Sequence, residues 1–493
     1  MKLSRRTVLT GGTAAAAATA LPLQLSSAAG QNEPRADPRS GESLALARYV
    51  TNTRYEDLPA DVVAMTKRAI LDAIGVSLAA SGLEPACKPF IEFALESGGP
   101  REAKILGTGQ RAPIVVAALA NGSLAHAMDY EDAHEETRTH PNAAAVAAAL
   151  PLAEKLGASG RDLITAIALG CDVVCRLARA LVAEGAPPPG FYQPAIVGTF
   201  GATTAAAKLL GLSAEQVLDA WSLALCQNSC TQELQDSPAS TIRAIREGPC
   251  ARVGIESALL AAKGVRGFTA PFEGRSGFFV MYANGVQRQT LIADLGKRFA
   301  GRDISFKAWP SCRDTHIYVQ AALELLNERP IDPAQIESVT GIASEQQMIV
   351  LEPATLKRRP ETAIAAKFSL YFTLAAALID RRVDFASFSD TALRRADVLA
   401  LADRVAYRID PSAFRDGHVL EIELRDGTVH RRRVRAAYGS PAAPMPDEAL
   451  VKKFLDCGGR AMRPAPMRTL QRIADEILHL EAVPRIAKLL EPI

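Results

Sequence analysis

The strongest constraint on the fold is a helical pattern of apolar residues that runs with short breaks from residue 43 to residue 285. Apolar side chains recur there every three or four residues, and the breaks carry Gly, Pro or Asn. Ala is abundant and aromatic residues make up only 5% of the chain, so the core must be largely aliphatic, which suits closely packed helices. The pattern predicts helices over residues 115–128, 143–156, 161–182, 195–210, 214–227 and 250–262.

The pattern changes between residues 286 and 445. Alternating or β-branched runs predict strands over residues 336–343, 404–409, 419–423 and 429–436, and helices fit residues 318–327 and 364–379. The last two strands flank an Asp426-Gly427 turn, which is a strong signal for a hairpin. Charges on both faces of residues 430–435 indicate that the second strand of the hairpin is an exposed edge.

From residue 446 onward the pattern is helical again. We therefore expect a mainly α fold. An all-helical domain would be built from residues 43–285 and 446–493, with an inserted α+β lid domain at residues 286–445. The length of 493 residues also favours more than one folding unit.

The first 29 residues predict a twin-arginine signal peptide. Arg5 and Arg6 precede an Ala-rich apolar run and a small-residue cleavage site near residues 26–29. A short membrane anchor is the alternative, but Pro22 interrupts the run, which is shorter than the roughly 20 residues a spanning helix needs. Residues 30–42 predict a linker, because they are polar and rich in Gly and Pro. We expect export by the twin-arginine machinery to the periplasm or beyond.

The charge balance argues against a nucleic-acid-binding protein. The chain has 56 Lys and Arg against 54 Asp and Glu, a net charge of +2, whereas phosphate binding needs a clustered basic surface. The sequence has no Walker loop, no G-x-G-x-x-G after a strand and no G-x-S-x-G. Its eight cysteines lack C-x-x-C spacing, and most are predicted to be buried apolar residues.

The densest polar cluster spans residues 121–140 and holds three of the seven histidines and five acids. Such side chains could bind a divalent metal, but no H-E-x-x-H or comparable signature is present, so we predict no metal site. A solvated acidic loop is the other alternative. Predicted apolar helices on both sides would instead bring the loop against the body of the protein, where acid–base chemistry finds groups with tuned pKa values.

Six segments carry a resemblance to a known family. They are His126-Ala-Met-Asp129-Tyr-Glu-Asp132 with Thr139-His140-Pro141, residues 194–202, Phe272-Glu273-Gly274 with Gly277-Phe278-Phe279, residues 306–312 with His316, residues 366–369, and Tyr438-Gly439. Their order resembles that of the MmgE/PrpD family of 2-methylcitrate dehydratases, cis-aconitate decarboxylases and iminodisuccinate epimerases. The resemblance spans residues 43–490.

The resemblance implies a helical domain from both chain ends with a smaller α/β lid, in a homodimer without metal or organic cofactor. It implies an enzyme that attacks a C–H bond next to a carboxylate-bearing carbon of a di- or tricarboxylate. Our nominal expectation is a hydro-lyase of the 2-methylcitrate dehydratase type. The alternatives are an epimerase or decarboxylase of a related polycarboxylate, and an exported carboxylate-binding protein without catalysis.

The resemblance assigns acid–base roles to Asp129 and His140. It places Lys307 and His316 on the lid, whose closure would complete the site and exclude water. Each of these residues also has a structural alternative: a surface acid at a helix end, a loop histidine, a solvated lysine, and a capping or core histidine.

The chain departs from the family pattern at positions that bear on chemistry. Tyr192 stands where members often carry His, Arg243 where they carry Lys, and Phe372 where a Pro-Tyr order is typical. Arg binds a carboxylate through two hydrogen bonds but is a poor proton shuttle, so binding of a polyanion is better supported than any one reaction. We predict that Tyr192, Arg243 and Arg246 bind the substrate; a solvated basic face is the alternative for the two arginines.

Overall fold

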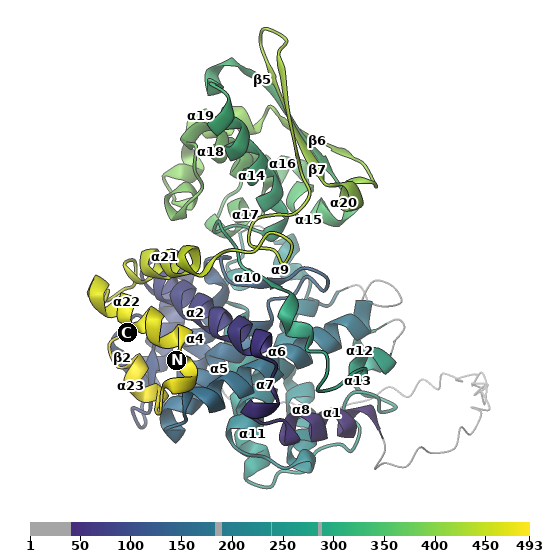
Figure 1. Cartoon of the computed structure of the whole chain (residues 1–493), viewed down its shortest axis with the longest axis vertical. Helices are drawn as coiled ribbons and strands as arrows, with labels where there is room; N and C mark the ends of the chain where they lie inside the picture. The colour runs from purple at the N-terminus through teal and green to yellow at the C-terminus, as the bar shows by residue number, and fades with distance from the viewer. Residues whose placement is uncertain (1–40, 183–189, 238, 284–287) are drawn as a thin grey trace, which may run out of the picture. The chain divides into compact units, whose positions relative to one another are not determined.

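The computed structural model describes residues 41–182, 190–237, 239–283 and 288–493. Helices dominate it, which confirms the mainly α fold (Figure 1). The predicted signal peptide and residues 30–40 of the predicted linker lie outside the described residues. Within the described ranges, no helix has the length and apolar character to cross a membrane.

Six long helices before residue 283 form a shared core. They are α2 (Ala60–Leu83), α4 (Ile114–Ala127), α5 (Pro141–Leu156), α6 (Gly160–Val182), α7 (Gln193–Leu209) and α11 (Glu247–Ala262). Helix α7 packs against α5, α6 and α11. Small residues allow this close approach: a Cβ at Gly201 of α7 would lie 2.4 Å from the Val174 side chain of α6. The predicted helices in this part of the chain are therefore confirmed, with ends shifted by a few residues.

The other α-helices and strands in this part of the chain are mostly shorter. They are α1 (Glu42–Asn52), α3 (Lys88–Glu96), α8 (Ala214–Gln227), α9 (Glu233–Asp236), α10 (Ile242–Ile245), α12 (Phe278–Tyr282), α13 (Arg288–Ile292), and the paired strands β1 (Ala103–Ile105) and β2 (Gln110–Ala112).

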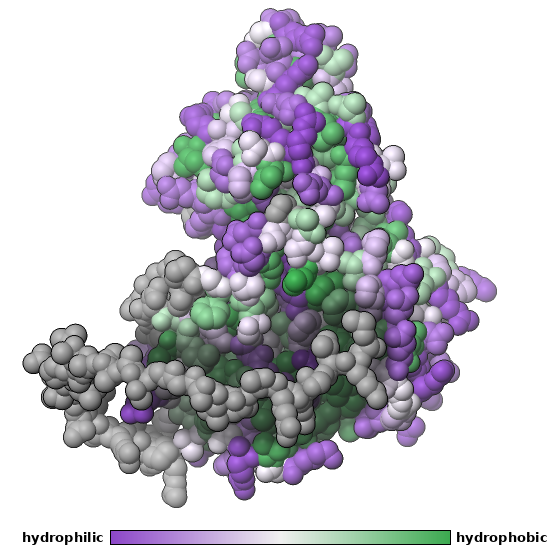
Figure 2. Space-filling model, turned by 180° about the vertical axis from the view of Figure 1, so that it is seen from behind, coloured by the Kyte–Doolittle hydropathy of each residue, from purple (hydrophilic) through white to green (hydrophobic). Residues whose placement is uncertain are grey.

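A four-stranded sheet follows, in the order β6-β5-β7-β8. Strands β5 (Ile336–Ala343) and β6 (Val405–Ile409) are parallel, and β7 (His418–Leu424) is antiparallel to β5 and to β8 (Val429–Val434). The predicted hairpin is confirmed, with β8 as the edge strand, and the hairpin tip at the top of both views is hydrophilic (Figures 1 and 2). Helices α14 (Arg313–Glu328), α18 (Leu370–Asp380) and α19 (Ala396–Ala402) accompany the sheet; α14 packs against β7 and β8, and α18 against β6, α14 and α19.

The single helix predicted over residues 364–379 is wrong, because the structure divides it into α17 (Ala363–Lys367) and α18. The Ser369 hydroxyl accepts a hydrogen bond from the Phe372 N–H (3.0 Å) and so starts a new helix. Phe372 itself is buried against Phe388, with ring centroids 6.4 Å apart, so this departure from the family pattern serves apolar packing. The break leaves Phe368 between the two helices.

The helices after residue 446 are α21 (Asp447–Gly458), α22 (Met467–Leu478) and α23 (Ile486–Leu490). Both α21 and α22 pack against α2, far away in the sequence. The remaining short elements are α15 (Met348–Leu351), α16 (Ala354–Arg358), α20 (Ala413–Asp416), and the paired strands β3 (Ala133–His134) and β4 (Ile304–Ser305). The domain boundaries at residues 285 and 445 stay a prediction.

Candidate functional site

The first part of the loop that joins α4 to α5, from Asp129 to His134, lies mostly inside the protein. Asp129, Glu131 and Asp132 have no solvent-exposed surface, so a solvated acidic loop is excluded for its first part, whereas Glu135 and Glu136 are exposed. Asp129 is the second residue after the end of α4 and has a φ of 48°, in the left-handed region that few non-glycine residues occupy. After this turn, polar atoms of Asp129 and Glu131 lie within 4.8 Å of His126 and His140.

Asp129 and Lys307 form a buried ion pair. The Lys307 Nζ lies 2.8 Å from Asp129 Oδ1 and donates a second hydrogen bond to the Asp129 carbonyl (3.0 Å). Burial disfavours both charges, but each stabilises the other. The pKa of Asp129 is therefore held below its ordinary value, and that of Lys307 is held above its ordinary value.

Segments from distant parts of the chain hold Lys307 in place. Strands β3 and β4 pair antiparallel and bring the segment before Lys307 against the loop. The Phe306 N–H donates to the Gly439 carbonyl (2.9 Å), and a Cβ at residue 439 would lie 1.9 Å from the Phe306 oxygen. Lys453 of α21 donates to the Lys307 carbonyl (3.0 Å) and pairs with Asp72 of α2 (2.6 Å). The Tyr438-Gly439 segment and the C-terminal helices thus support the site.

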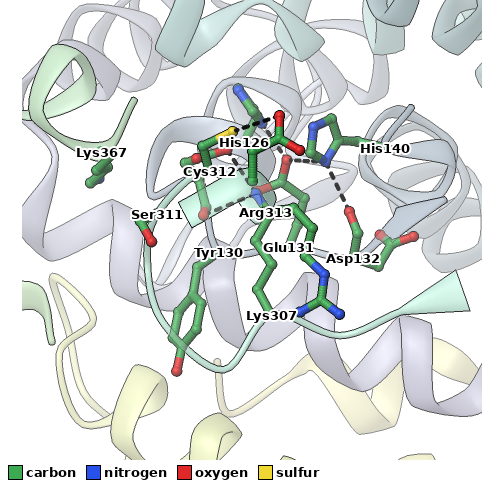
Figure 3. Close-up of polar contacts among 12 residues, drawn as sticks. His126, Tyr130, Glu131, Asp132, His140, Lys307, Ser311, Cys312, Arg313 and Lys367 are labelled. Carbon is green, nitrogen blue, oxygen red and sulfur yellow. Dashed lines mark hydrogen bonds and ion pairs between the residues drawn. The ribbon is translucent and has the colours of Figure 1, made fainter. Parts of the chain in front are cut away.

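Glu131 bridges two histidines (Figure 3). Its Oε1 contacts His126 Nδ1 and lies 2.9 Å from His140 Nδ1. Burial opposes its charge, yet His126 and Lys307 hold the pKa of Glu131 well below its ordinary value. Burial lowers the pKa of His126 to about 3, with a further contribution from Arg246. His126 is therefore neutral and donates its Nδ1–H to an ionised Glu131.

The hydrogen bonds of His140 fix its tautomer. Its Nδ1 lies 2.9 Å from the Asp132 carbonyl, which can only accept, so Nδ1 carries a proton. Within the described residues, its Nε2 has no hydrogen-bond partner, and the ring lines a cavity. His140 therefore carries its proton on Nδ1, between the Asp132 carbonyl and the Glu131 carboxylate, and leaves Nε2 available to a ligand.

Asp132 is a buried acid that favours its protonated form. Burial raises its pKa to about 8, although the Asn142 amide donates a hydrogen bond to it (2.9 Å). An unfolded Asp has a pKa near 3.9, so folding takes up a proton between these values. The free energy of unfolding should then fall as the pH rises from about 4 to about 8.

Asp132→Asn tests this pH dependence, because Asn keeps the shape and the hydrogen-bond acceptor but cannot ionise. We expect urea titrations at a series of pH values to show a gain of stability in the variant, relative to the natural chain, that grows from pH 4 to pH 8 and then levels off. A difference that does not depend on pH would contradict the protonated state of Asp132.

His140 lines a cavity of about 410 Å³. Its lining brings together the sequence candidates Asp129, His140, Tyr192, Arg243 and Lys307 with His134, Cys312 and Arg313. The cavity has positive charge that no acid neutralises. Arg313 pairs with Glu135, and Lys307 pairs with Asp129. The Nε and Nη2 of Arg243, in contrast, have no hydrogen-bond partner among the described residues. Such a lining suits a polyanionic ligand.

The two candidate arginines are buried rather than solvated. Arg243 is 5% exposed and stacks on Phe368, with its Cζ 3.4 Å from the ring centroid. Arg246 is 3% exposed, pairs with Glu247 (3.1 Å) and lies 5.1 Å from the Tyr192 ring centroid. A solvated basic face is thus excluded for both. Arg243 lines the cavity, while Arg246 lies behind Tyr192 and does not belong to the cavity lining.

His316 lies outside the cavity lining. Its Nε2 is 3.2 Å from the Ser311 carbonyl and its Nδ1 is 3.3 Å from Arg313 Nη1, so both ring nitrogens have partners in the protein. Burial and the adjacent Arg313 hold its pKa well below the ordinary value. This neutral ring supports Arg313, which also donates to the Tyr438 carbonyl (2.8 Å) and pairs with Glu135.

Four side chains of the site could also hold a metal ion. His126, Asp129, Glu131 and His140 each offer one ligand atom, and these atoms lie within 4.8 Å of one another. In the structure the Lys307 ammonium and the two imidazoles contact these carboxylates. A lysine thus supplies positive charge at the place where a metal would bind.

Sequence reasoning assigned no role to Glu131, Cys312, Arg313 or Lys453. Glu131 and Cys312 lie inside segments that carry the family resemblance, and Arg313 directly follows Cys312. Their position in or beside these segments was the one sequence feature that could have marked them as site residues. Lys453 lies on an amphipathic helix, and no local pattern distinguishes it from a solvated lysine.

Comparison with known proteins places this chain in a family. Residues 44–290 match the MmgE/PrpD N-terminal domain and residues 309–479 match the MmgE/PrpD C-terminal domain. The chain is 25% identical to the cis-aconitate decarboxylase of Aspergillus terreus (strain NIH 2624 / FGSC A1156) over 481 residues, which cover 92% of this chain and 96% of that protein. It is 27% identical to the Homo sapiens cis-aconitate decarboxylase, over 89% of this chain and 92% of that protein. With both domains matched over most of its length, the chain belongs to the MmgE/PrpD family.

Proposed function

We propose that this protein is a lyase that decarboxylates cis-aconitate or a closely related polycarboxylate. The observation that carries the proposal is the polar cavity in which His140, supported by Glu131, faces the cations Lys307 and Arg243. Relatives that share nearly the whole length of the chain are cis-aconitate decarboxylases. The comparisons thus favour decarboxylation over the dehydration that was our nominal expectation.

The reaction defines what the site must supply. Decarboxylation breaks the C–C bond to one carboxylate and releases CO2, and the bonding electron pair stays on the carbon framework, delocalised into a conjugated carboxylate. A proton must then be delivered to carbon, so one proton is consumed for each CO2 released. Catalysis therefore needs cations at the retained carboxylates and one well-placed proton donor.

Cations in the cavity meet the first need. Arg243 offers a buried guanidinium with two unpaired nitrogens, which matches a carboxylate in a bidentate pair. Lys307 lies on another wall, and its charge is maintained by Asp129 and Glu131. Tyr192 adds a hydroxyl from the start of α7. These groups hold the retained carboxylates and stabilise the negative charge that develops as CO2 leaves.

His140 meets the second need. In its imidazolium form, Nδ1–H would be held by the Asp132 carbonyl and the Glu131 carboxylate, and Nε2–H would remain to donate to the ligand. Protonation of the carbon by Nε2 leaves the Nδ1–H tautomer that the structure contains. The ring then takes up a proton from solvent, from which it is not fully shielded, since 13% of its side chain is exposed.

The direct test gives the purified protein cis-aconitate, 2-methylcitrate and an aspartate-derived imino acid in D2O, and follows the products by NMR. We expect CO2 release from cis-aconitate and one deuterium at carbon in the product. Elimination of water from 2-methylcitrate without decarboxylation would instead identify a hydro-lyase. Inversion alone would identify an epimerase, and tight binding without any reaction an exported binding protein.

Removal of metal should not abolish turnover. Because the Lys307 ammonium provides the positive charge beside Asp129, we expect protein dialysed against EDTA to keep its full decarboxylation rate. The control is the same protein after addition of Mg²⁺, Mn²⁺ or Zn²⁺. A loss of activity that one of these ions restores would assign a metal to the four-residue cluster and contradict the cofactor-independent reaction.

We also propose that the protein is exported by the twin-arginine route and acts as a homodimer. The support is the Arg5-Arg6 pair before an Ala-rich run, and the resemblance to a family of homodimers. Cell fractionation of the natural chain and of an Arg5→Lys/Arg6→Lys variant tests the first claim, since only the natural chain should leave the cytoplasm. Sedimentation velocity of the purified protein tests the second.

A further inference from the structure

A second cavity adjoins the polar one. It has a volume of about 600 Å³, against about 410 Å³ for the polar cavity, and the two share Arg243, Ile349 and Phe368 as common wall. Pockets that hold small organic ligands span about 300–1,000 Å³, so the polar cavity alone is large enough for a small tricarboxylate. The second cavity is therefore additional space that opens beside the substrate site.

Arg243 stands at the junction of the two cavities. Its guanidinium is held over the Phe368 ring, yet its Nε and Nη2 have no hydrogen-bond partner among the described residues. A buried guanidinium with unused donors is costly unless a ligand satisfies it. An anionic group bound there would lie at the boundary, with the rest of the ligand able to extend to either side.

The far side of the junction suits an uncharged group. Most of its wall is apolar, from residues such as Leu234, Met348, Ile349, Ile364 and Phe368. Met348 and Ile349 are only partly buried, so their apolar surface is available to a ligand.

The charged residues around this cavity nearly cancel. Beyond Arg243, the lining has two cations, Lys357 and Arg359, and three acids, Asp236, Glu352 and Glu361. Arg359 also pairs with Asp403 (2.5 Å). A second carboxylate would therefore find less attraction here than in the polar cavity. An apolar chain, by contrast, would remove hydrocarbon surface from water.

We propose that the natural substrate is a polycarboxylate that carries an apolar alkyl substituent, with its carboxylates in the polar cavity, one of them on Arg243, and its alkyl chain in the adjoining cavity. This inference rests on the proposed function for the identity of the polar head. It goes further in assigning a substrate class larger than cis-aconitate itself.

Binding measurements test the inference without relying on turnover. The probes are tricarballylate (propane-1,2,3-tricarboxylate) and derivatives that carry propyl or hexyl groups on a terminal methylene, which are saturated and do not decarboxylate. Each buried methylene strengthens binding, so we expect calorimetry with the full chain to give a Kd for the hexyl acid about 10-fold or more below that of the parent acid.

Two variants locate the alkyl chain. Ala365 is partly buried and lines only the second cavity, so Ala365→Phe should fill the space and remove the hexyl gain. The matched control is Ala386→Phe, which adds the same ring at an exposed position outside both cavities and should keep the gain. Met348→Ala removes an apolar contact instead of adding bulk, and it should reduce the gain in affinity from the hexyl group several-fold. This variant replaces Ala365→Phe as the test if Ala365→Phe does not fold.

Equal Kd values across the alkyl series would overturn the inference, as would a hexyl gain that survives both cavity variants, or no measurable binding of any member. These outcomes are separate from the proposed function. Failure to release CO2 from cis-aconitate and from its alkyl-substituted derivatives would refute the decarboxylase and leave an alkyl gain standing, whereas decarboxylation with equal Kd values would keep the decarboxylase and refute the alkyl-binding cavity.

Discussion

Replacement of His140 by glutamine is expected to lower kcat for decarboxylation by about 10²–10⁴-fold, the usual contribution of a positioned general acid. Glutamine can replace the hydrogen bond that Nδ1 donates to the Asp132 carbonyl, but it cannot deliver a proton from the Nε2 position. The ring only forms part of the cavity wall and does not bind the retained carboxylates, so KM should change little.

The control for this prediction is His479→Gln, at an exposed histidine that follows α22. Stopped assays of CO2 release across pH 5–9 would measure both variants, and circular dichroism would verify that His140→Gln remains folded. If His140→Gln kept more than a tenth of the natural kcat, His140 would not be the proton donor.

The second large effect is on stability. Lys307→Met leaves the Asp129 carboxylate buried without its partner, and breaking a buried ion pair in this way costs about 3–5 kcal/mol. We expect the free energy of unfolding to fall by that amount in urea titrations followed by circular dichroism. Turnover should be lost as well, because a cation is removed from the cavity.

A double-mutant cycle separates the ion pair from general disruption. Asp129→Asn combined with Lys307→Met leaves no unpaired charge between the two positions, so the double variant should lose less stability than the sum of the two single variants. Lys88→Met is the matched surface control: Lys88 is 70% exposed and pairs with Glu92 at 3.7 Å, so its loss should hardly change stability. Additive losses at Lys307 and Asp129 would mean that the pair does not couple.

Much of the fold follows from local sequence. Apolar periodicity located the core helices, and strand β5 has the bounds that alternation and β-branching predicted, because these elements bury one regular face each. The break between α17 and α18 escaped the periodicity, since the apolar pattern continues through it. Only the Ser369 cap separates the two helices. Whether the Ser369 hydroxyl accepts a hydrogen bond from the Phe372 N–H, or the helix instead continues through this position, depends on the surrounding structure.

The sequence predicted most of the residues that line the cavity, but not how they contact one another. Asp129, His140, Lys307, Tyr192 and Arg243 all line one cavity. Local spacing does not reveal that Glu131 bridges two histidines, because that contact depends on the left-handed turn at Asp129. The contacts of His316 also depend on the tertiary structure. The sequence therefore could not show that both of its ring nitrogens have partners, the Ser311 carbonyl and Arg313.

The central claim is that this cavity removes CO2 from a polycarboxylate and returns a proton to carbon. The most direct measurement is NMR of the purified protein with 13C-labelled cis-aconitate in D2O. The account predicts one labelled CO2 and one deuterated carbon per molecule consumed, and formation of both products about 10²-fold or more slowly with His140→Gln. Consumption of cis-aconitate by addition of water, with no CO2 and with the same rate in His140→Gln, would contradict it.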